Sequence, residues 1–279
     1  QDIKIKIIYQ VNMNKNYLTF EKKDFVEMNF DEILNIQIKN NEIFPFNLKI
    51  SGNKNKPDDF SSKCEGPGIY FITEKKNNTL LYIGVHSPQN ETVYNARYYK
   101  HISTFTMRGY RIAKQQKDLE IYNLLKSKNY LKVLQNHLLS KCKGKNAIDE
   151  EFLQCLQEAM CKGKEVYKKS VGIQVSLRRV AYANYCWNVF NVKDINLIRQ
   201  NFKNHFLFHY IKLPYLLEIS SKKRERFLFM KKNIETPLIN YFKPLVNSDS
   251  PNEFDFEEQN FTKFDLEKIN EKLNEFIRK

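Results

Sequence analysis

The chain has 279 residues, of which 42% are hydrophobic and 14% aromatic, so it can build a sizeable core. Its 46 Lys and Arg outnumber its 32 Asp and Glu, and the formal net charge of +14 points to a polyanionic partner such as nucleic acid. The apolar runs fall far short of the roughly 20 residues that a membrane-spanning helix needs. We expect a folded cytoplasmic protein that contacts no membrane.

The positive charge is concentrated in the middle of the chain. Residues 61–247 hold 32 basic and 14 acidic side chains, residues 1–60 are balanced, and residues 248–279 are acidic. A solvating basic tail would be expected at a terminus, so this distribution predicts a basic surface on the folded body. The alternative explanation is a genome rich in A and T, which would favour lysine throughout.

The cysteines argue against a disulfide framework and against zinc. They are odd in number and irregularly spaced, which favours reduced thiols. No Cys-x-x-Cys pair accompanies the one histidine near them, so we expect no zinc site. The residues concerned are Cys64, Cys142, Cys155, Cys161, Cys186 and His137.

The first sixty residues read as a separate extension. Residues 1–10 alternate Ile and Lys, which predicts a strand and lacks the apolar region of a secretory signal. Further strand-like segments follow up to residue 50, and the polar, turn-rich stretch 51–62 predicts a linker. We therefore expect a β-containing N-terminal extension over 1–60, acting as a recognition or dimerisation arm.

A hairpin and a helix come next. Residues 68–73 and 80–84 are predicted strands joined by a polar turn at 75–78. The following helix, 93–105, carries Arg97 and His101, which share one face because they lie four residues apart.

Helices dominate the rest of the predicted structure. Residues 113–203 show helical spacing of apolar side chains, and 206–219 reads as a strand pair or one long strand interrupted at Pro214. A helix over 224–241 is predicted, with Ser220 or Ser221 as its cap. Pro237 would kink that helix and Pro244 would end it. The acidic segment 248–279 ends in an amphipathic helix with a capping pattern from Thr262 to Asp265.

The motifs in the hairpin carry a family resemblance. Gly-Ile-Tyr at 68–70 and Tyr-Ile-Gly at 82–84, with eleven residues between them, resemble the motifs of the GIY-YIG endonucleases. Arg97 and His101 match the Arg-x-x-x-His helix of restriction-type members. Glu-Thr-Pro-Leu-Ile at 235–239 and Phe-Lys-Pro-Leu-Val-Asn at 242–247 are similar to the family's closing pattern. The motif-bearing resemblance covers 66–112 and about 204–247.

The resemblance implies an α+β fold, a small antiparallel sheet flanked by helices, with a large helical insertion at about 113–203 inside a nuclease domain spanning 61–247. It implies hydrolysis of DNA phosphodiester bonds with Mg²⁺, or Mn²⁺, held by Glu235. Arg97 would clamp the scissile phosphate through its planar fork. Tyr70 is the general base that the family proposes. Tyr82, His101 and Asn247 would orient water, contact phosphate or hold the site together.

Two departures accompany the resemblance. Many family members place a basic residue directly after the second motif, where this chain has Val85 and then His86. His86 or Lys100 could compensate by favouring the phenolate of Tyr70. The second departure is the insertion, which we expect to clamp or recognise DNA; the alternative is a helical support layer with aromatics in its core. Its bases and aromatics include Lys141, Lys143, Lys145, Lys162, Lys164, Lys168, Lys169, Arg178, Arg179, Tyr182, Tyr185 and Trp187.

The function expected from the sequence is a Mg²⁺-dependent DNA endonuclease, most similar to restriction endonucleases. Double-stranded DNA would be its partner, a homodimer would suit a palindromic target, and a cognate DNA methyltransferase would accompany it in the cell. Structure-specific repair nucleases and mobile-element nucleases are alternatives within the same chemistry. A nucleic-acid-binding protein that has lost cleavage is the alternative from another class. Considered one at a time, each motif residue could also be an ordinary core or surface residue without a catalytic role.

Overall fold

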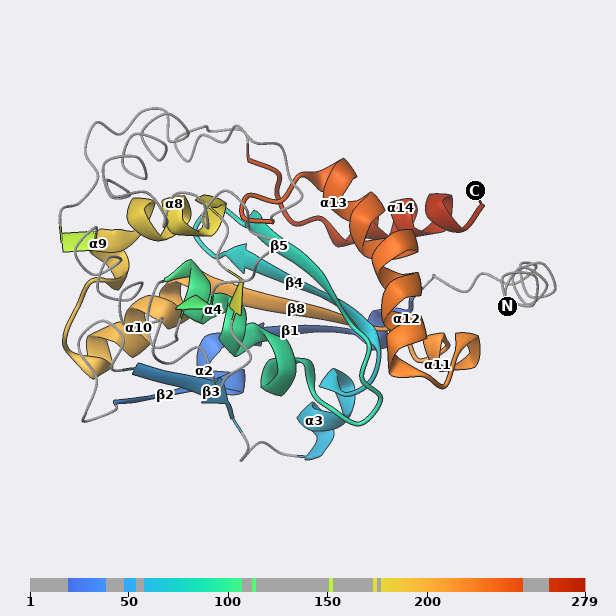
Figure 1. Cartoon of the computed structure of the whole chain (residues 1–279), viewed down its shortest axis with the longest axis horizontal. Coiled ribbons are helices and arrows are strands. Elements are labelled where there is room, and N and C mark those ends of the chain that lie inside the picture. Colours follow the sequence, from blue (N-terminus) through green and yellow to red (C-terminus); the bar gives the residue numbers. More distant parts are fainter. Residues whose placement is uncertain are drawn as a thin grey trace.

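The computed structural model describes residues 20–38, 48–53, 58–106, 112–113, 151–152, 173–174, 177–247 and 261–278. The fold is α+β, as expected, with antiparallel sheets flanked by helices (Figure 1). The main sheet has the order β1-β8-β4-β5, and β2 pairs with β3 in a smaller hairpin. The strands are β1 (Phe25–Asn29), β2 (Leu34–Ile38), β3 (Leu48–Gly52), β4 (Gly68–Glu74), β5 (Thr79–His86), β6 (Ile112–Ala113), β7 (Ile173–Gln174) and β8 (Phe206–Lys212).

Helices cover both faces of the main sheet (Figure 1). One face packs against α4, α8, α9 and α10, and the other against α11, α12, α13 and α14. Two π-helical segments, η2 and η3, precede α4 and α13. The helices are η1 (Lys22–Asp24), α2 (Phe30–Ile33), α3 (Asp58–Cys64), η2 (Tyr94–Tyr98), α4 (Tyr99–Phe105), α8 (Leu177–Tyr185), α9 (Trp187–Phe190), α10 (Ile195–His205), α11 (Leu216–Ile219), α12 (Lys223–Met230), η3 (Lys231–Glu235), α13 (Thr236–Phe242) and α14 (Leu266–Arg278).

The predicted hairpin is confirmed. β4 and β5 pair antiparallel, with Tyr70 opposite Gly84, and the turn between them includes Asn78 at φ 52°. Every residue of β5 is buried. Strands buried on both faces need not alternate polar and apolar residues, which explains the nearly continuous apolar runs of the two motif strands.

The turn that follows α13 covers the open edge of β5. The backbone amides of Leu245 and Val246 donate to the carbonyls of Leu80 and Leu81 at 3.0 and 2.9 Å. An uncovered edge would leave these carbonyls without partners, so the chain after α13 completes the sheet.

Within the N-terminal part of the chain, β1 belongs to the main sheet. β1 pairs antiparallel with β8, which places Glu27 opposite His209. The expected linker over 51–62 is wrong where the structure describes it, because β3 extends to Gly52 and α3 begins at Asp58.

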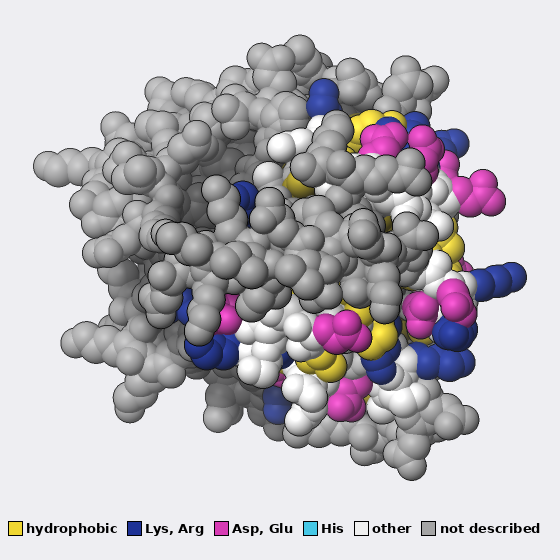
Figure 2. Space-filling model, turned by 90° about the vertical axis from the view of Figure 1, so that its right-hand side faces the viewer, with side chains coloured by type: hydrophobic (Ala, Val, Ile, Leu, Met, Phe, Trp, Pro, Cys, Tyr) yellow, Lys and Arg dark blue, Asp and Glu magenta, His cyan; other side chains and the backbone are white. Residues whose placement is uncertain are grey.

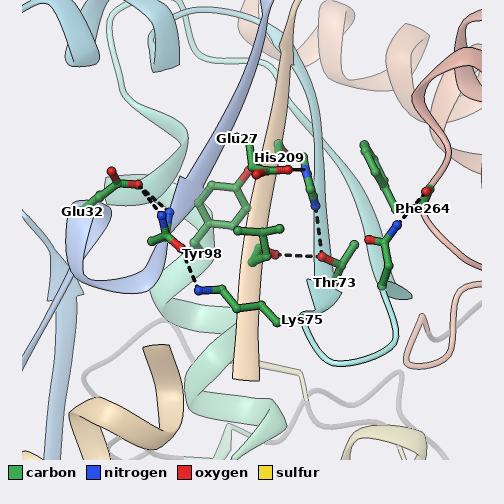
Figure 3. Close-up of polar contacts among 10 residues, drawn as sticks. Glu27, Glu32, Thr73, Lys75, Tyr98, His209 and Phe264 are labelled. Atoms are coloured by element: carbon green, nitrogen blue, oxygen red, sulfur yellow. Dashed lines mark hydrogen bonds and ion pairs between the residues drawn. The ribbon is translucent and has the colours of Figure 1, made fainter. Parts of the chain in front are cut away.

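A polar cluster on one face of the sheet joins the buried Thr73 and His209 to the exposed Glu27 (Figure 3). Nε2 of His209 lies 3.0 Å from Oγ1 of Thr73, and its Nδ1 lies 3.5 Å from Oε2 of Glu27. Phe264 stacks on the imidazole at 3.9 Å between ring centres. Since both Thr73 and His209 are fully buried, the cluster serves packing.

Several predicted boundaries need correction. After β8, the chain forms the short helix α11 rather than a second strand, because Pro214 ends the sheet pairing. The long helix begins at Lys223 without a cap from Ser220 or Ser221. It passes through η3, so that Pro237 falls in the first turn of α13, where its missing N–H is tolerated.

The two remaining helix ends follow the sequence more closely. Lys243 takes the left-handed conformation at φ 48°, which ends α13 directly before Pro244 as predicted. At the start of α14 the capping residue is Asp265, whose Oδ1 accepts from Lys268 N at 3.0 Å, and not Thr262.

Some expectations lie outside the described residues. These are the strand at 1–10, most of the helical insertion with its lysines at 141–169, and the acidic segment 248–260. Within the part that is described, no helix is both long and apolar enough to cross a bilayer.

Candidate active site

The site is built around the phenol of Tyr70, which lies across the neighbouring strand. A Cβ placed on Gly84 would come within 2.3 Å of Cζ and 2.4 Å of the hydroxyl of Tyr70. Any larger residue at 84 would collide with the ring, so the last glycine of the second motif makes room for the last tyrosine of the first.

Three aromatic side chains enclose Tyr70. Its hydroxyl lies 2.9 Å from Nε2 of His101. Tyr82 stacks on its ring with centres 5.9 Å apart, and Tyr98 meets it edge-on at 5.5 Å. Tyr82 also lies 4.2 Å from the imidazole of His101. The structure therefore brings Tyr70, Tyr82 and His101 into direct contact, while Tyr98, which sequence reasoning missed, fixes the orientation of the central ring.

Tyr98 is itself held by the sheet. Its hydroxyl donates to the carbonyl of His209 at 2.7 Å, and its ring packs edge-on against Phe208 at 4.7 Å. Because both its backbone and its hydroxyl are held, the ring of Tyr98 has a fixed orientation against Tyr70. Its position directly after Arg97 was the only sequence signal for this role.

Burial sets the protonation states of the central pair. It raises the pKa of Tyr70 well above 10.0, and Tyr82 raises it further; Arg97 lowers it, and Glu235 raises it. Burial also lowers the pKa of His101 well below 6.5, assisted by the positive charges of Arg179, Arg97 and Lys100. Near neutral pH, Tyr70 is therefore a neutral phenol and His101 a neutral imidazole.

Arg97 and Glu235 lie on the two π-helical segments. Arg97 is the fourth residue of η2, and Glu235 is the last residue of η3. Both side chains are half-buried. Their charges act in opposite directions on the pKa of Tyr70 and of Tyr82, so both reach the same pair of phenols. π-Helical turns inside α-helices occur often at functional sites, because the extra residue redirects a side chain.

Asn247 completes the edge of β5 instead of pointing its amide at Tyr70. Its Oδ1 accepts from the backbone N–H of Ile83 and its Nδ2 donates to the carbonyl of Ile83, both at 2.8 Å. Ile83 directly follows Tyr82 in the strand. Of the roles expected for Asn247, holding the site together is the one that these contacts serve.

His86 is not the cation that could replace a basic residue after the second motif. It is fully buried, and its Nε2 lies 2.8 Å from the carbonyl of Glu91. Burial lowers its pKa to about 4, so the ring is neutral near pH 7. Lys100 is half-buried, and its charge reaches His101.

Arg179 is a cation of this site that the motifs did not indicate. Its guanidinium carbon lies 5.3 Å from the centre of the Tyr82 ring, and the side chain is only 6% exposed. It comes from α8, in the insertion, about 80 residues after Arg97. Nothing in the sequence distinguishes it from the other bases of the insertion.

Glu235 is the residue of this site that could hold a metal ion. Among the residues that the structure describes, no three His, Cys, Asp or Glu side chains converge as a metal-ligand group. A single half-buried carboxylate suits Mg²⁺, which keeps several waters and takes further oxygens from a substrate phosphate. The donor set therefore fits Mg²⁺ or Mn²⁺.

One side of the molecule carries described charges of mixed sign. On the side of the molecule where α11, α12 and α14 lie, the visible Lys and Arg side chains alternate with Asp and Glu (Figure 2). One example is Lys222, which pairs with Glu225 at 3.1 Å. The described charges on this side offer no uniform track for a polyanion.

Comparisons of the chain with models of protein families, with curated proteins and with solved structures find no match. The residues of the site and the resemblance of their motifs are therefore the observations that bear on the protein's function.

Proposed function

We propose that the protein is a Mg²⁺-dependent DNA endonuclease, most similar to the restriction endonucleases of the GIY-YIG family. One observation carries the proposal: the hydroxyl of Tyr70 is hydrogen-bonded to a neutral His101 under the opposed charges of Arg97 and Glu235. Three other motif residues thus act on the phenol of Tyr70. Independent packing roles would not require this convergence.

The neutral pair is suited to moving a proton. Hydrolysis of a phosphodiester requires a water molecule to lose a proton as its oxygen attacks phosphorus. Tyr70 can accept that proton on its oxygen while its own hydroxyl proton passes to Nε2 of His101, 2.9 Å away. Because no free phenolate is needed, the raised pKa of Tyr70 is compatible with activity near pH 7.

The charged residues suit the phosphate. The guanidinium of Arg97 would donate to phosphate oxygens and stabilise the charge that builds on them. Glu235 would hold Mg²⁺, which supplies electrostatic stabilisation of the leaving oxygen when it is bound. Asn247 fixes β5, and with it Tyr82, in place.

Cleavage of plasmid and phage DNA in the presence of Mg²⁺ tests the proposal. The wild-type protein should give discrete fragments, which Glu235→Ala and Arg97→Ala should abolish. Glu218→Gln, which alters an exposed carboxylate on α11, is the matched control and should cleave as the wild type does. Unchanged cleavage by Glu235→Ala would remove the metal assignment.

The same experiment separates the alternatives. Random nicking, or cutting confined to branched substrates, would favour a repair or mobile-element nuclease. Binding of DNA without cleavage under any divalent cation would favour a protein that has lost activity. Discrete fragments would make a restriction role in the cytoplasm, with a cognate DNA methyltransferase in the same cell, the next hypothesis. Sedimentation with and without a palindromic target would then test a homodimer.

A further inference from the structure

Arg179 places a buried guanidinium against two aromatic rings of the site. Its guanidinium carbon lies 5.3 Å from the centre of the Tyr82 ring and 5.8 Å from that of Phe105, and the side chain is 6% exposed. Burying a cation away from water costs free energy unless charged or polar groups interact with it. A guanidinium can face an aromatic ring with favourable energy, and this stacking fixes the ring as well as the cation.

The helix that carries Arg179 is attached on two sides. Nη1 of the adjacent Arg178 donates to the carbonyl of Leu245 at 3.1 Å, which ties α8 to the segment covering the edge of β5. Tyr182, one turn along α8, meets Phe105 of α4 edge-on at 6.2 Å. These contacts tie α8 to the strand of Tyr82 and to the helix of His101, and thereby set where Arg179 lies.

We propose that Arg179 is a positioning residue of the nuclease reaction, which holds the Tyr82 ring against His101 and places a fixed positive charge beside the Tyr70–His101 pair. This inference rests on the proposed function for its role in cleavage, whereas the placement of the charge can be tested without DNA. It gives the insertion a part in the reaction site itself.

The electrostatics agree with this geometry. After burial, Arg179 has the largest influence on the pKa of Tyr82 and on that of His101, and it lowers both. The other cations that face His101 are Arg97 from η2 and Lys100 from its own helix, and the phenols of Tyr70 and Tyr82 face it from β4 and β5. All three cations disfavour imidazolium, so the ring stays neutral, and in its Nδ1–H tautomer Nε2 can accept the hydroxyl proton of Tyr70.

Titration of His101 by NMR, with ¹³C-labelled histidine in the full chain, tests the placement. The His101 resonance is assigned from His101→Gln. Arg179→Gln removes the charge and should raise the pKa of His101 by about one pH unit or more. Arg179→Met, a second neutral variant, should do the same and serves where Arg179→Gln fails to fold.

Arg178→Gln is the matched control, since it removes the neighbouring buried guanidinium on the same helix. It should leave the titration of His101 unchanged while lowering stability through the lost bond to Leu245. A His101 pKa in Arg179→Gln or Arg179→Met equal to that of the wild type would overturn the proposal.

Arg179→Lys separates the charge from the planar group. It should keep the titration of His101 close to that of the wild type, because the positive charge remains. Single-turnover cleavage should slow roughly 10- to 100-fold, because no planar guanidinium then stacks on the ring of Tyr82. Wild-type rates in this variant would overturn the role of Arg179 in holding the ring. If the wild-type protein does not cleave DNA, the proposed function fails, and the NMR titration still decides where the charge acts.

Discussion

The hydroxyl of Tyr70 and Nε2 of His101, 31 residues apart in the chain, lie 2.9 Å from each other in the interior of the protein. Because burial raises the pKa of the phenol and lowers that of the imidazole, this hydrogen bond joins two neutral groups near pH 7. A neutral pair avoids the cost of burying charged groups at this site.

Replacing Tyr70 with Phe should slow cleavage strongly while the protein stays folded. The variant keeps the ring and removes the hydroxyl, so we expect the rate to fall about 10²- to 10⁴-fold. Unfolding free energy should fall by about 1 to 2 kcal/mol, because Nε2 of His101 loses its partner. Single-turnover cleavage and urea denaturation measure the two effects.

Tyr210→Phe is the control for this experiment, since Tyr210 lies opposite Tyr70 in the sheet and donates its hydroxyl to the carbonyl of Gly66 at 2.5 Å. It should lose similar stability and retain cleavage. Equal loss of cleavage in both variants would show that the hydroxyl of Tyr70 has no special part.

Gly84→Ala should displace the phenol of Tyr70. The added Cβ would lie 2.3 Å from Cζ of that ring, so the side chain must move or the strands must separate. Overpacking of this kind costs about 1 to 3 kcal/mol. Thermal unfolding should show the loss, and it should be smaller when Gly84→Ala is combined with Tyr70→Ala, which empties the space. An equal loss in both backgrounds would mean that the clash is relieved elsewhere.

Asn247→Ala should destabilise the edge of β5. It leaves the buried N–H and carbonyl of Ile83 without their side-chain partners, and each such group costs about 1 to 3 kcal/mol. Asn274→Ala is the comparison, because the amide of Asn274 donates within α14 from a half-buried position and its loss should cost about 1 kcal/mol or less. Urea denaturation that ranks the two variants equally would contradict this role for Asn247.

Stability should fall in mild acid. Burial lowers the pKa of His86 and of His205 from 6.5 to about 4, and that of His209 from 6.5 to about 3. Below pH 6.5 the unfolded chain binds protons at these residues and the folded chain does not, so the unfolding free energy decreases as pH falls and levels off near their folded pKa values.

His209→Gln tests this dependence at one position. The carboxylate of Glu27, 3.5 Å from Nδ1, would favour a charged ring, but that carboxylate is more than half exposed and burial outweighs it. Removing the histidine should reduce the slope of unfolding free energy against pH, between about 4 and 6, by about 1.4 kcal/mol per pH unit. An unchanged slope would show that His209 titrates normally.

The hairpin and the helix of Arg97 could be predicted because their signals are local. Strand patterns, a polar turn and helical spacing place Tyr70, Tyr82 and His101 correctly. Their contact requires η2 and α4 to pack on the face of β4 and β5 that carries the two tyrosines, and only the motif resemblance indicated it. The helix expected from residue 224 begins at Lys223, so its start is confirmed to within one residue. The short helix α11 escaped prediction, because the chain leaves the sheet at Pro214.

The role of β1 and of Arg179 could not be predicted at all. β1 pairs with β8 across about 180 residues of chain, and no local pattern specifies such a partner. Arg179 contacts the ring of Tyr82 on β5, and an arginine in the sequence of the insertion gives no indication of that contact. Long-range pairing and the burial of one charge among many depend on the assembled fold.

The two widened helical turns also affect how this chain should be aligned with others. Each of η2 and η3 contains one residue more than regular α-helical winding would hold, and one residue corresponds to about 100° of rotation. A homologue with an ordinary helix there would need its gap inside 94–98 or 231–235. A gap shifted into a neighbouring loop would match Arg97 and Glu235 with residues on the wrong side of the helix and hide a common ancestry.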